Sequence, residues 1–462
     1  MLRWTGLGLF LILVNAAGAQ TNDSLFISKI SDEVLVNGKA YDNLRVLCKT
    51  IGGRLAGSPQ IYKAEKWGAD ALRAAGADKV YLQECKVPRW VRGGKDSAWV
   101  RYTSTTEKPH WLKKRLDVLA LGNSLGTGPK GVEAWVILIN DFEELERRKD
   151  EIKGKIVFFN HSFNEKYVQT FRAYGEAGPY RWNGPSRAAK YGAVAVVIRS
   201  LSASTDNYPH TGSMGYDSAY PKIPCAAMGL RDADTLAALF QHRRNIWLHY
   251  YSNAHFLPDT IGHNVIGEYT GSESPREYIT VGGHLDSWDP AEGAHDDGTG
   301  CVHSIEVLRA MKALGYRPKH TLRVVLFVNE ENGLRGGEKY AEQAAAGQEK
   351  HLFALESDGG GFTPRGFSFS LQPAQLEKLR AWIPLLFPYG IAAFDEGGGG
   401  ADVTPLYERM SVPVAELRPD GQRYFDIHHT RNDVFENVNK RELELGAISM
   451  AGLLYLVDKY GL

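Results

Sequence analysis

Residues 277–331 decide the fold. They begin EYITVGGHLDSWD (277–289), continue through AHDDGTG (294–300) and end TLRVVLFVNEE (321–331). The first and last segments contain apolar runs rich in β-branched residues, which are typical of buried strands. Between them, residues 299–314 have the pattern of a helix. A strand, a helix and a second strand in this order predict two parallel strands joined by a crossover helix.

The same alternation extends on both sides of this stretch. A strand is expected at NVIGEYTG (264–271), a helix at GLRGGEKYAEQAAA (333–346) and another strand at HLFALESD (351–358). Strands that alternate with helices of this length predict an α/β fold with a mostly parallel mixed sheet flanked by helices. In such sheets, functional residues gather beyond the carboxyl ends of the strands.

The chain before this region divides into two parts. Helices are expected from about Ala40 and over 60–75. From about residue 105 the pattern changes to short strands separated by turns. The block 105–254 has its own apolar elements and few residues suited to catalysis, so it is predicted to be an inserted β-rich domain. The main domain is therefore expected in two parts, 20–104 and 255–462.

Residues 1–19 read MLRWTGLGLFLILVNAAGA. Arg3 precedes an apolar run from Gly6 to Val14, and the small residues Ala17-Gly18-Ala19 follow it, which is the layout of a secretory signal cleaved before Gln20. The run is too short for a spanning helix, which needs about 20 apolar residues. No later segment is long and apolar enough to span a bilayer. The mature protein is therefore expected to be secreted or periplasmic, with no membrane span.

Charge and cysteine usage exclude several classes of protein. The 462 residues contain 54 Lys and Arg against 54 Asp and Glu, with no basic stripe, so no nucleic-acid partner is expected. The four cysteines form no CxxC pair. This excludes a disulfide-dense scaffold and a cysteine-rich zinc module, and one disulfide or none is expected.

Metal-binding side chains follow the predicted strands. They lie at three strand ends, in the turn before residue 299 and near the C-terminus: His284 and Asp286; His295, Asp296 and Asp297; Glu330 and Glu331; Glu356 and Asp358; His428 and His429. Each motif alone has an ordinary explanation as a turn or a solvated face. Together they place charges after apolar runs, where burial is costly without a counter-charge. A cation removes that cost, and imidazoles with carboxylates indicate zinc or a similar divalent ion.

The chemistry of paired metals suggests roles for these residues. Two metals about 3.5–4 Å apart activate a water and polarise a carbonyl. One carboxylate must bridge them, and a separate carboxylate must stay off the metals to act as base. Glu330 and Glu331 suit the division between base and ligand, because neighbours at a strand end point in different directions. Asp286 is placed to accept the second N–H of the His284 imidazole.

The motif order HLDSWD, DDGTG, NEE, ESD and HHT resembles the co-catalytic zinc aminopeptidase and carboxypeptidase family. The resemblance covers essentially all of the mature chain, and the intervals between the motifs agree. GKIVFFN, GAVAVVIRS and KIPCAAM in the middle block resemble the protease-associated domain that interrupts these peptidases. The resemblance implies the zinc exopeptidase fold, two Zn²⁺ per chain and a peptide substrate. A homodimer is suggested by the resemblance alone.

The resemblance also implies a role for individual residues. Glu330 would be the general acid/base. The implied metal ligands are Asp296 as the bridge, His284 and Asp358 on one zinc, and Glu331 and His429 on the other.

The sequence departs from the family in two places. His295 precedes the bridging Asp296, where relatives usually have a residue that does not bind metal. His428 stands beside His429, so two residues compete for the last ligand position, and the family alignment favours His429. The glycine-rich loop 397–406 resembles the family's substrate loop. In it, Asp402 is a candidate to contact a substrate terminus, and a merely flexible glycine loop is the alternative.

The leading hypothesis is an exported dizinc exopeptidase that acts on dipeptides or short peptides. Overall similarity favours a carboxypeptidase or dipeptidase over an aminopeptidase. Recognition of a free carboxylate needs a positioned Arg, Lys or nest of amides, for which Arg335, Arg418 and Arg423 are candidates. Two other readings are a receptor-like binding protein, disfavoured because all five ligands are present, and a glutaminyl cyclase, which uses one zinc and normally has no such insert.

Overall fold

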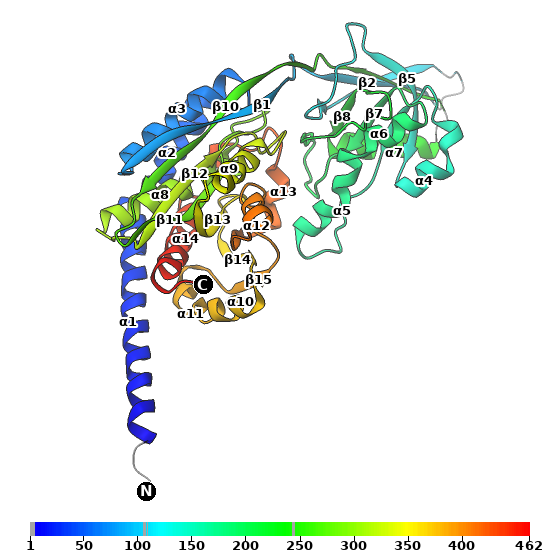
Figure 1. The fold of residues 1–462 in the computed structure, drawn as a ribbon. Helices are drawn as coiled ribbons and strands as arrows, with labels where there is room; N and C mark the ends of the chain where they lie inside the picture. Colours follow the sequence, from blue (N-terminus) through cyan, green and yellow to red (C-terminus); the bar gives the residue numbers. More distant parts are fainter. Residues whose placement is uncertain (1–4, 105–107, 109, 243–244) are drawn as a thin grey trace.

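The computed structural model describes residues 5–104, 108, 110–242 and 245–462. These residues form two eight-stranded sheets (Figure 1). The strands of the first sheet are, in spatial order, β1 (Lys79–Val91), β10 (His255–Tyr269), β12 (His320–Phe327), β11 (Ser274–His284), β13 (Lys350–Glu356), β16 (Val414–Pro419), β14 (Pro364–Ser370) and β15 (Ala393–Glu396).

The centre of the first sheet is parallel and its flanks are mixed. Strands β12, β11, β13 and β16 run parallel to one another, as the strand–helix alternation predicts. Strand β10 pairs antiparallel with β1 and β12, and β14 pairs antiparallel with β16. The predicted α/β fold is therefore confirmed, with a mixed sheet.

Helices cover both faces of this sheet, which explains why its central strands contain continuous apolar runs. In β12, Val324 and Leu326 belong to the core on one face, whereas Val325 and Phe327 belong to the core on the other. The helices of this body are α1 (Thr5–Asn37), α2 (Ala40–Val46), α3 (Pro59–Ala74), α8 (Thr299–Ala313), α9 (Arg335–Ala346), α10 (Pro373–Arg380), α11 (Ile383–Leu386), α12 (Thr404–Met410), α13 (Tyr424–Ile427) and α14 (Lys440–Tyr460).

The second sheet lies in a separate body at the far end of the β1–β10 ribbon (Figure 1). Its strands are, in spatial order, β3 (Trp111–Leu116), β2 (Ser97–Thr103), β9 (Ile246–Tyr251), β5 (Val132–Ile139), β6 (Ile156–Phe159), β7 (Ala195–Arg199), β8 (Cys225–Met228) and β4 (Val118–Ala120). Its helices are α4 (Phe142–Arg147), α5 (Thr170–Trp182), α6 (Gly184–Lys190) and α7 (Leu230–His242). We call residues 97–251 the second module.

The second module begins earlier than the sequence predicts. Strand β2 precedes the predicted boundary at 105, yet it pairs with β9 and β3 of the second sheet. The predicted boundary at residue 254 lies just before β10, where the chain returns to the first sheet. Strand β1, which leads to the second module, pairs with β10 from Lys79 to Val91.

Helix α1 runs through the predicted signal and beyond it. Residues 1–4 of the signal lie outside the described part of the chain, and the first turns of α1 extend away from the main body (Figure 1). From Asp23 onward the helix packs on α14, with Ile27, Ile30 and Val34 buried. Among the described residues, no helix has both the length and the hydropathy needed to cross a membrane.

Candidate metal centre

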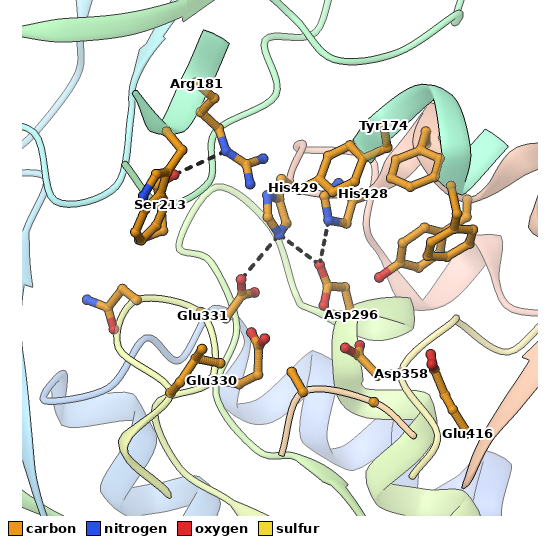
Figure 2. Close-up of a pocket in the computed structure, with 18 of the residues that line it drawn as sticks. Tyr174, Arg181, Ser213, Asp296, Glu330, Glu331, Asp358, Glu416, His428 and His429 are labelled. Atoms are coloured by element: carbon orange, nitrogen blue, oxygen red, sulfur yellow. Dashed lines mark hydrogen bonds and ion pairs between the residues drawn. The ribbon is translucent and has the colours of Figure 1, made fainter. Parts of the chain in front are cut away.

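The strand ends of the first sheet bring the predicted ligands together. His284 is the last residue of β11, Glu330 and Glu331 follow β12, and Asp358 follows β13. Because these three strands are adjacent and parallel, their carboxyl ends meet at one edge. Asp296 lies in a turn at 294–298 that leads into α8. His429 follows α13, which reaches the same edge from the C-terminal part of the chain (Figure 2).

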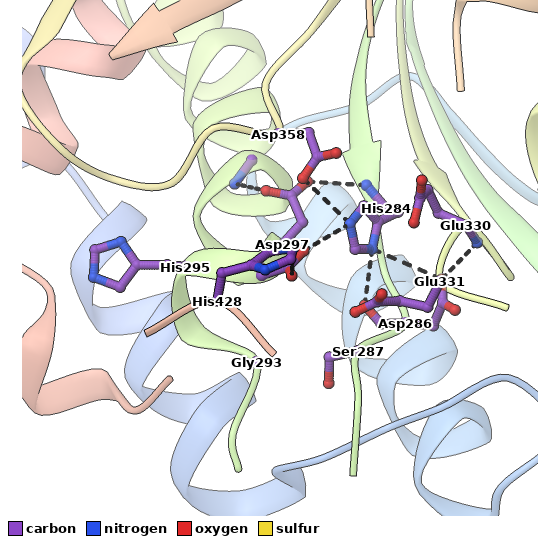
Figure 3. Close-up of polar contacts among 12 residues, drawn as sticks. His284, Asp286, Ser287, Gly293, His295, Asp297, Glu330, Glu331, Asp358 and His428 are labelled. Atoms are coloured by element: carbon purple, nitrogen blue, oxygen red, sulfur yellow. Dashed lines mark hydrogen bonds and ion pairs between the residues drawn. The ribbon is translucent and has the colours of Figure 1, made fainter. Parts of the chain in front are cut away.

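Asp296 lies at the centre of two groups of side chains. On one side, His284 Nε2 is 3.2 Å from Asp296 Oδ1. The same nitrogen is 3.3 Å from Asp358 Oδ1 (Figure 3). On the other side, His429 Nε2 is 3.1 Å from Asp296 Oδ2 and 3.2 Å from Glu331 Oε2 (Figure 2). All five predicted ligands therefore converge, and Asp296 presents one oxygen to each group.

The spacing and chemistry of these atoms fit zinc. Two ligands that each lie about 2.0–2.1 Å from a tetrahedral zinc are roughly 3.3 Å apart, which matches the measured distances. His284 Nε2, Asp296 Oδ2 and Asp358 Oδ1 are buried and have no hydrogen-bond partner among the described residues. Buried polar atoms without partners are costly. A cation in the first group would satisfy His284 Nε2 and Asp358 Oδ1, and a cation in the second group would satisfy Asp296 Oδ2.

The shifted pKa values of Glu331 and His429 also fit a metal site. Burial raises the pKa of Glu331 to about 7, and the Asp296 charge adds to this rise. Burial alone would lower the pKa of His429, but the Glu331 and Asp296 carboxylates outweigh it and raise this pKa well above its ordinary value. Both shifts favour a proton on this pair of side chains. A zinc ion held here would need the ionised carboxylate and the neutral imidazole, so its binding would depend on pH.

His284 is oriented by a main-chain carbonyl. Its Nδ1 lies 2.9 Å from the carbonyl oxygen of Asp286 and 3.8 Å from the Asp286 carboxylate. The carboxylate instead accepts the main-chain N–H of Glu330 at 3.1 Å. The Asp286 side chain therefore does not make the predicted contact with the imidazole: its main-chain carbonyl makes it instead, and its carboxylate contacts the segment that carries Glu330.

The two histidines that departed from the family pattern have separate surroundings. His295 points away from the cluster, stacks on Phe362 and accepts the N–H of Gly361 at 3.1 Å (Figure 3). His428 stacks on His429 with ring centroids 3.5 Å apart, and its Nε2 lies 3.6 Å from Asp296. His429 is nearer to Asp296 than His428 is, and it also contacts Glu331, which favours it as the ligand.

Three further residues support the cluster: Asp297, which the sequence analysis named only as a possible metal-binding side chain, and Asp433 and Arg54, which it did not identify. The Asp297 carboxylate accepts the N–H of His284 at 3.0 Å, and the Asp433 carboxylate accepts the N–H of Asp296 at 3.2 Å. The fully buried Arg54 donates to the carbonyls of Leu285, Glu292 and Gly293. The second Asp of the DDG motif was a visible signal for Asp297. Arg54 has none, because its partners are backbone atoms more than two hundred residues away.

The cluster forms part of a cleft of about 610 Å³ between the two bodies. Glu330, Glu331, Asp296 and Asp358 line one side, and the second module contributes an opposite wall (Figure 2). That wall consists of Phe171, Tyr174, Arg181, Trp182 and Ser213. The cleft is therefore open to a ligand that would touch both bodies.

Of the residues predicted to contact the substrate, only Arg418 lines the cleft. Asp402 is buried, and Gly400 and Ala401 line the cleft in its place. Arg418 lines the cleft and pairs with Glu416 at 3.0 Å. The other two arginine candidates do not line it. Arg181, which the sequence analysis did not identify, is the cation that the second module contributes to the cleft.

The sequence matches the model of peptidase family M28 over residues 264–451. Carboxypeptidase Q of Mus musculus is 34% identical over 91% of this chain and 85% of its own length. Carboxypeptidase Q of Xenopus laevis is 36% identical over 88% of this chain and 84% of its own length.

Solved structures agree with this relationship. The crystal structure of a peptidase M28 precursor from Shewanella amazonensis superposes with a TM-score of 0.88 and 31% identity, covering 95% of this chain and 97% of that one. A zinc aminopeptidase from Bacillus subtilis shares the fold, with a TM-score of 0.65 and 19% identity, over 90% of this chain and 94% of its own. The chain therefore belongs to peptidase family M28 and is a zinc-dependent peptide hydrolase.

Proposed function

We propose that this protein is an exported dizinc exopeptidase of the carboxypeptidase or dipeptidase type, which hydrolyses dipeptides or short peptides. The observation that carries the proposal is the pair of ligand groups that share Asp296 at the side of a cleft between the two bodies. A cleft that presents metal ligands on one wall and a cation on the other suits a short peptide with a free terminus.

Two zinc ions are proposed per chain. His284 and Asp358 would hold one, Glu331 and His429 the other, and Asp296 both. Bound there, the ions would supply a Lewis acid for the scissile carbonyl and a water of lowered pKa. Metal analysis of purified protein should give two zinc ions per chain. One zinc per chain would favour the glutaminyl cyclase alternative.

Glu330 is proposed as the general base. Its side chain lines the cleft beside the ligands, and no ion pair joins it to another side chain within the described part of the structure. Burial raises the pKa of Glu330 well above its ordinary value, and Asp358 and Glu331 add to the rise. A carboxylate in this position can take a proton from the attacking water and return it to the leaving amine.

Arg181 supports a carboxypeptidase over an aminopeptidase, because it could bind the C-terminal carboxylate of a substrate. Its Nε donates to the Ser213 carbonyl at 3.1 Å, and its guanidinium borders the cleft near His429 (Figure 2). Among the described residues, Arg181 has no ion-pair partner, whereas Arg418 is paired with Glu416. An unpaired guanidinium is suited to a substrate carboxylate.

An aminopeptidase is the second candidate, because Glu416 also lines the cleft and could receive a substrate ammonium. Product analysis on dipeptides with free or blocked ends separates the two. Cleavage that requires a free C-terminus supports the proposal, and cleavage that requires only a free N-terminus supports the aminopeptidase. Arg181→Gln should raise the KM for substrates with a free carboxylate more than it lowers kcat.

The proposal includes two features of the chain outside the cleft. Residues 1–19 would be a signal peptide that is removed on export. The second module, predicted as the insert 105–254, would be the protease-associated domain that the sequence resembles.

A further inference from the structure

We infer that the loop 210–213 of the second module positions His429. The second module would then contribute to the geometry of the metal centre. The inference rests on the proposed function in one respect, namely that His429 is a zinc ligand. The loop reads His-Thr-Gly-Ser and joins the second body to the residue that completes one ligand group.

Thr211 contacts His429 at two points, both through its main chain. The Thr211 N–H donates to the His429 carbonyl at 3.0 Å. The Thr211 carbonyl lies 3.3 Å from His429 Nδ1. Because Nε2 faces Asp296 and Glu331, the proton of the neutral ring belongs on Nδ1, which can donate to Thr211. The two contacts fix both the backbone and the ring of His429.

His429 needs such support because of its backbone. Its φ is +62°, in the left-handed region that residues with a side chain rarely adopt. Conformations of this kind persist where surrounding contacts hold them. The N–H of Thr211 is one of these contacts, and it comes from a segment more than two hundred residues earlier in the chain.

Gly212 permits the close approach of the loop. Its φ is +124°, and a Cβ at this position would lie 2.6 Å from His429 Nδ1 and 2.5 Å from Arg181 Nη1. Any larger residue would therefore push against the imidazole on one side and the guanidinium on the other. A glycine is required here by both the backbone and the space.

Hydrogen bonds fix the loop 210–213 to the rest of the second module, so the position of the module determines the position of the loop. The Thr211 hydroxyl donates to the Ala120 carbonyl at 2.9 Å, at the end of β4. The Gly122 N–H donates to the Gly212 carbonyl, also at 2.9 Å. His210 and Thr211 are buried. A loop tied to its own sheet and bonded to His429 couples the placement of the second module to the geometry of the metal ligand.

The first test is Gly212→Ala, measured as zinc affinity of the metal-free protein by competition with a chromophoric chelator. Loss of a contact that orients a metal ligand typically costs about 10–100-fold in affinity, and we expect this loss at one of two zinc sites. Gly128→Ala is the matched control, because Gly128 has φ +76° in the same module and open space around it. It should keep both zinc ions at wild-type affinity.

A second pair of variants covers the case in which Gly212→Ala fails to fold. Thr211→Ala removes the hydroxyl that anchors the loop, and Thr211→Ser restores it. We expect Thr211→Ala to weaken one zinc site several-fold and Thr211→Ser to recover it. Wild-type affinity in Thr211→Ala and in any folded Gly212→Ala would overturn the inference.

His429→Ala separates this inference from the proposed function. If His429→Ala keeps two tight zinc ions, His429 is not a ligand and the proposed function fails in its metal assignment. If it loses one zinc ion while Gly212→Ala and Thr211→Ala keep both, the metal assignment stands and only the role of the loop is refuted. None of these measurements depends on peptide hydrolysis.

Discussion

Glu330 and Glu331 are neighbours in the chain with different surroundings. Glu331 lies 3.2 Å from His429 Nε2, whereas Glu330 lines the cleft without an ion-pair partner in the described chain. Glu330→Gln should therefore keep zinc content and Tm near wild type and lower kcat by roughly 10²–10⁴-fold, the usual contribution of a general base. Zinc occupancy and kcat measured in parallel provide the check.

Glu331→Gln is the matched control for this prediction. It removes a charged ligand, so one zinc ion should bind weakly and activity should partly recover with added metal. If Glu330→Gln loses zinc while Glu331→Gln retains two ions, the roles of base and ligand are reversed. Near-normal activity in both variants would exclude the proposed site.

Glu416 gives the metal-free protein a pH dependence. Burial raises the pKa of Glu416 to about 7, with Arg418 opposing the rise and Asp358 adding to it. Between its ordinary pKa of 4.5 and about 7, the folded protein holds a proton that the unfolded chain has lost. The free energy of unfolding therefore falls as the pH rises through this window.

Glu416→Gln should make this pH dependence less steep, because the amide cannot ionise, while Glu331 and Asp433, whose pKa values burial also raises to about 7, still contribute. Urea unfolding of both proteins between about pH 5 and about pH 8 measures the two slopes. Equal slopes in wild type and variant would show that Glu416 titrates in the folded protein as it does in the unfolded chain.

At the scale of elements, the segment between β11 and α8 must hold His284 and Asp296 at a fixed separation. The Arg54 guanidinium donates to carbonyls at both ends of this segment. These are Leu285 just after β11, and Glu292 and Gly293 shortly before the turn that carries Asp296. Arg54→Met should leave the carbonyls of Leu285 and Glu292 without a donor, at about 1–3 kcal/mol each, whereas Gly293 keeps the N–H of Gly298. We expect a loss of at least about 2 kcal/mol in the free energy of unfolding.

Arg54→Lys is the comparison, since an ammonium can serve some of the same carbonyls and should be less destabilising than Met. Urea unfolding of the metal-free proteins gives the stabilities, and chelator competition gives the zinc affinities. A wild-type stability for Arg54→Met would mean that the segment holds its shape without the guanidinium.

The central strands of the first sheet and the helices between them could be predicted because both faces of the sheet are buried there, so that these strands contain apolar runs such as the one in β12. Strands β14, β15 and β16 and the helices from α10 onward were not predicted. The ligands could be predicted because parallel strands place their carboxyl ends at one edge. Arg54, Thr211 and Arg181 could not. Arg54 and Thr211 act through main-chain atoms of distant segments, and Arg181 reaches the cleft only because the second module folds back towards His429.

At the scale of the whole molecule, the two bodies meet over the cleft through α5 and α13. Phe171 stacks on Tyr424 and Tyr174 on Phe425, with ring centroids 5.3 Å and 4.5 Å apart. This aromatic contact, together with the loop 210–213, holds the second module against the ligand edge of the first sheet. Neither sheet alone contains the complete cleft.

The N-terminus offers a further prediction at this scale. Exported protein should begin near Gln20, as N-terminal sequencing would show. A chain that starts at residue 20 should match the full chain in its free energy of unfolding, because the packing of α1 on α14 begins later. There the Asp23 carboxylate accepts from the hydroxyls of Tyr455 at 2.7 Å and Tyr460 at 2.6 Å. Exported material that still begins at Met1 would refute the signal assignment.

The β1–β10 ribbon would allow the second module to be removed or replaced without changing the first sheet. Val91 and His255 are the last paired residues of the ribbon, so the two ends of residues 92–254 are held one strand spacing apart, about 4.8 Å. An ordinary two-residue turn could close the same gap as a hairpin. A module attached at such a tip can be acquired, exchanged or replaced by a reporter in a single genetic step, with every pairing of the first sheet left in place. A successful graft would still have to present a backbone donor and acceptor to His429.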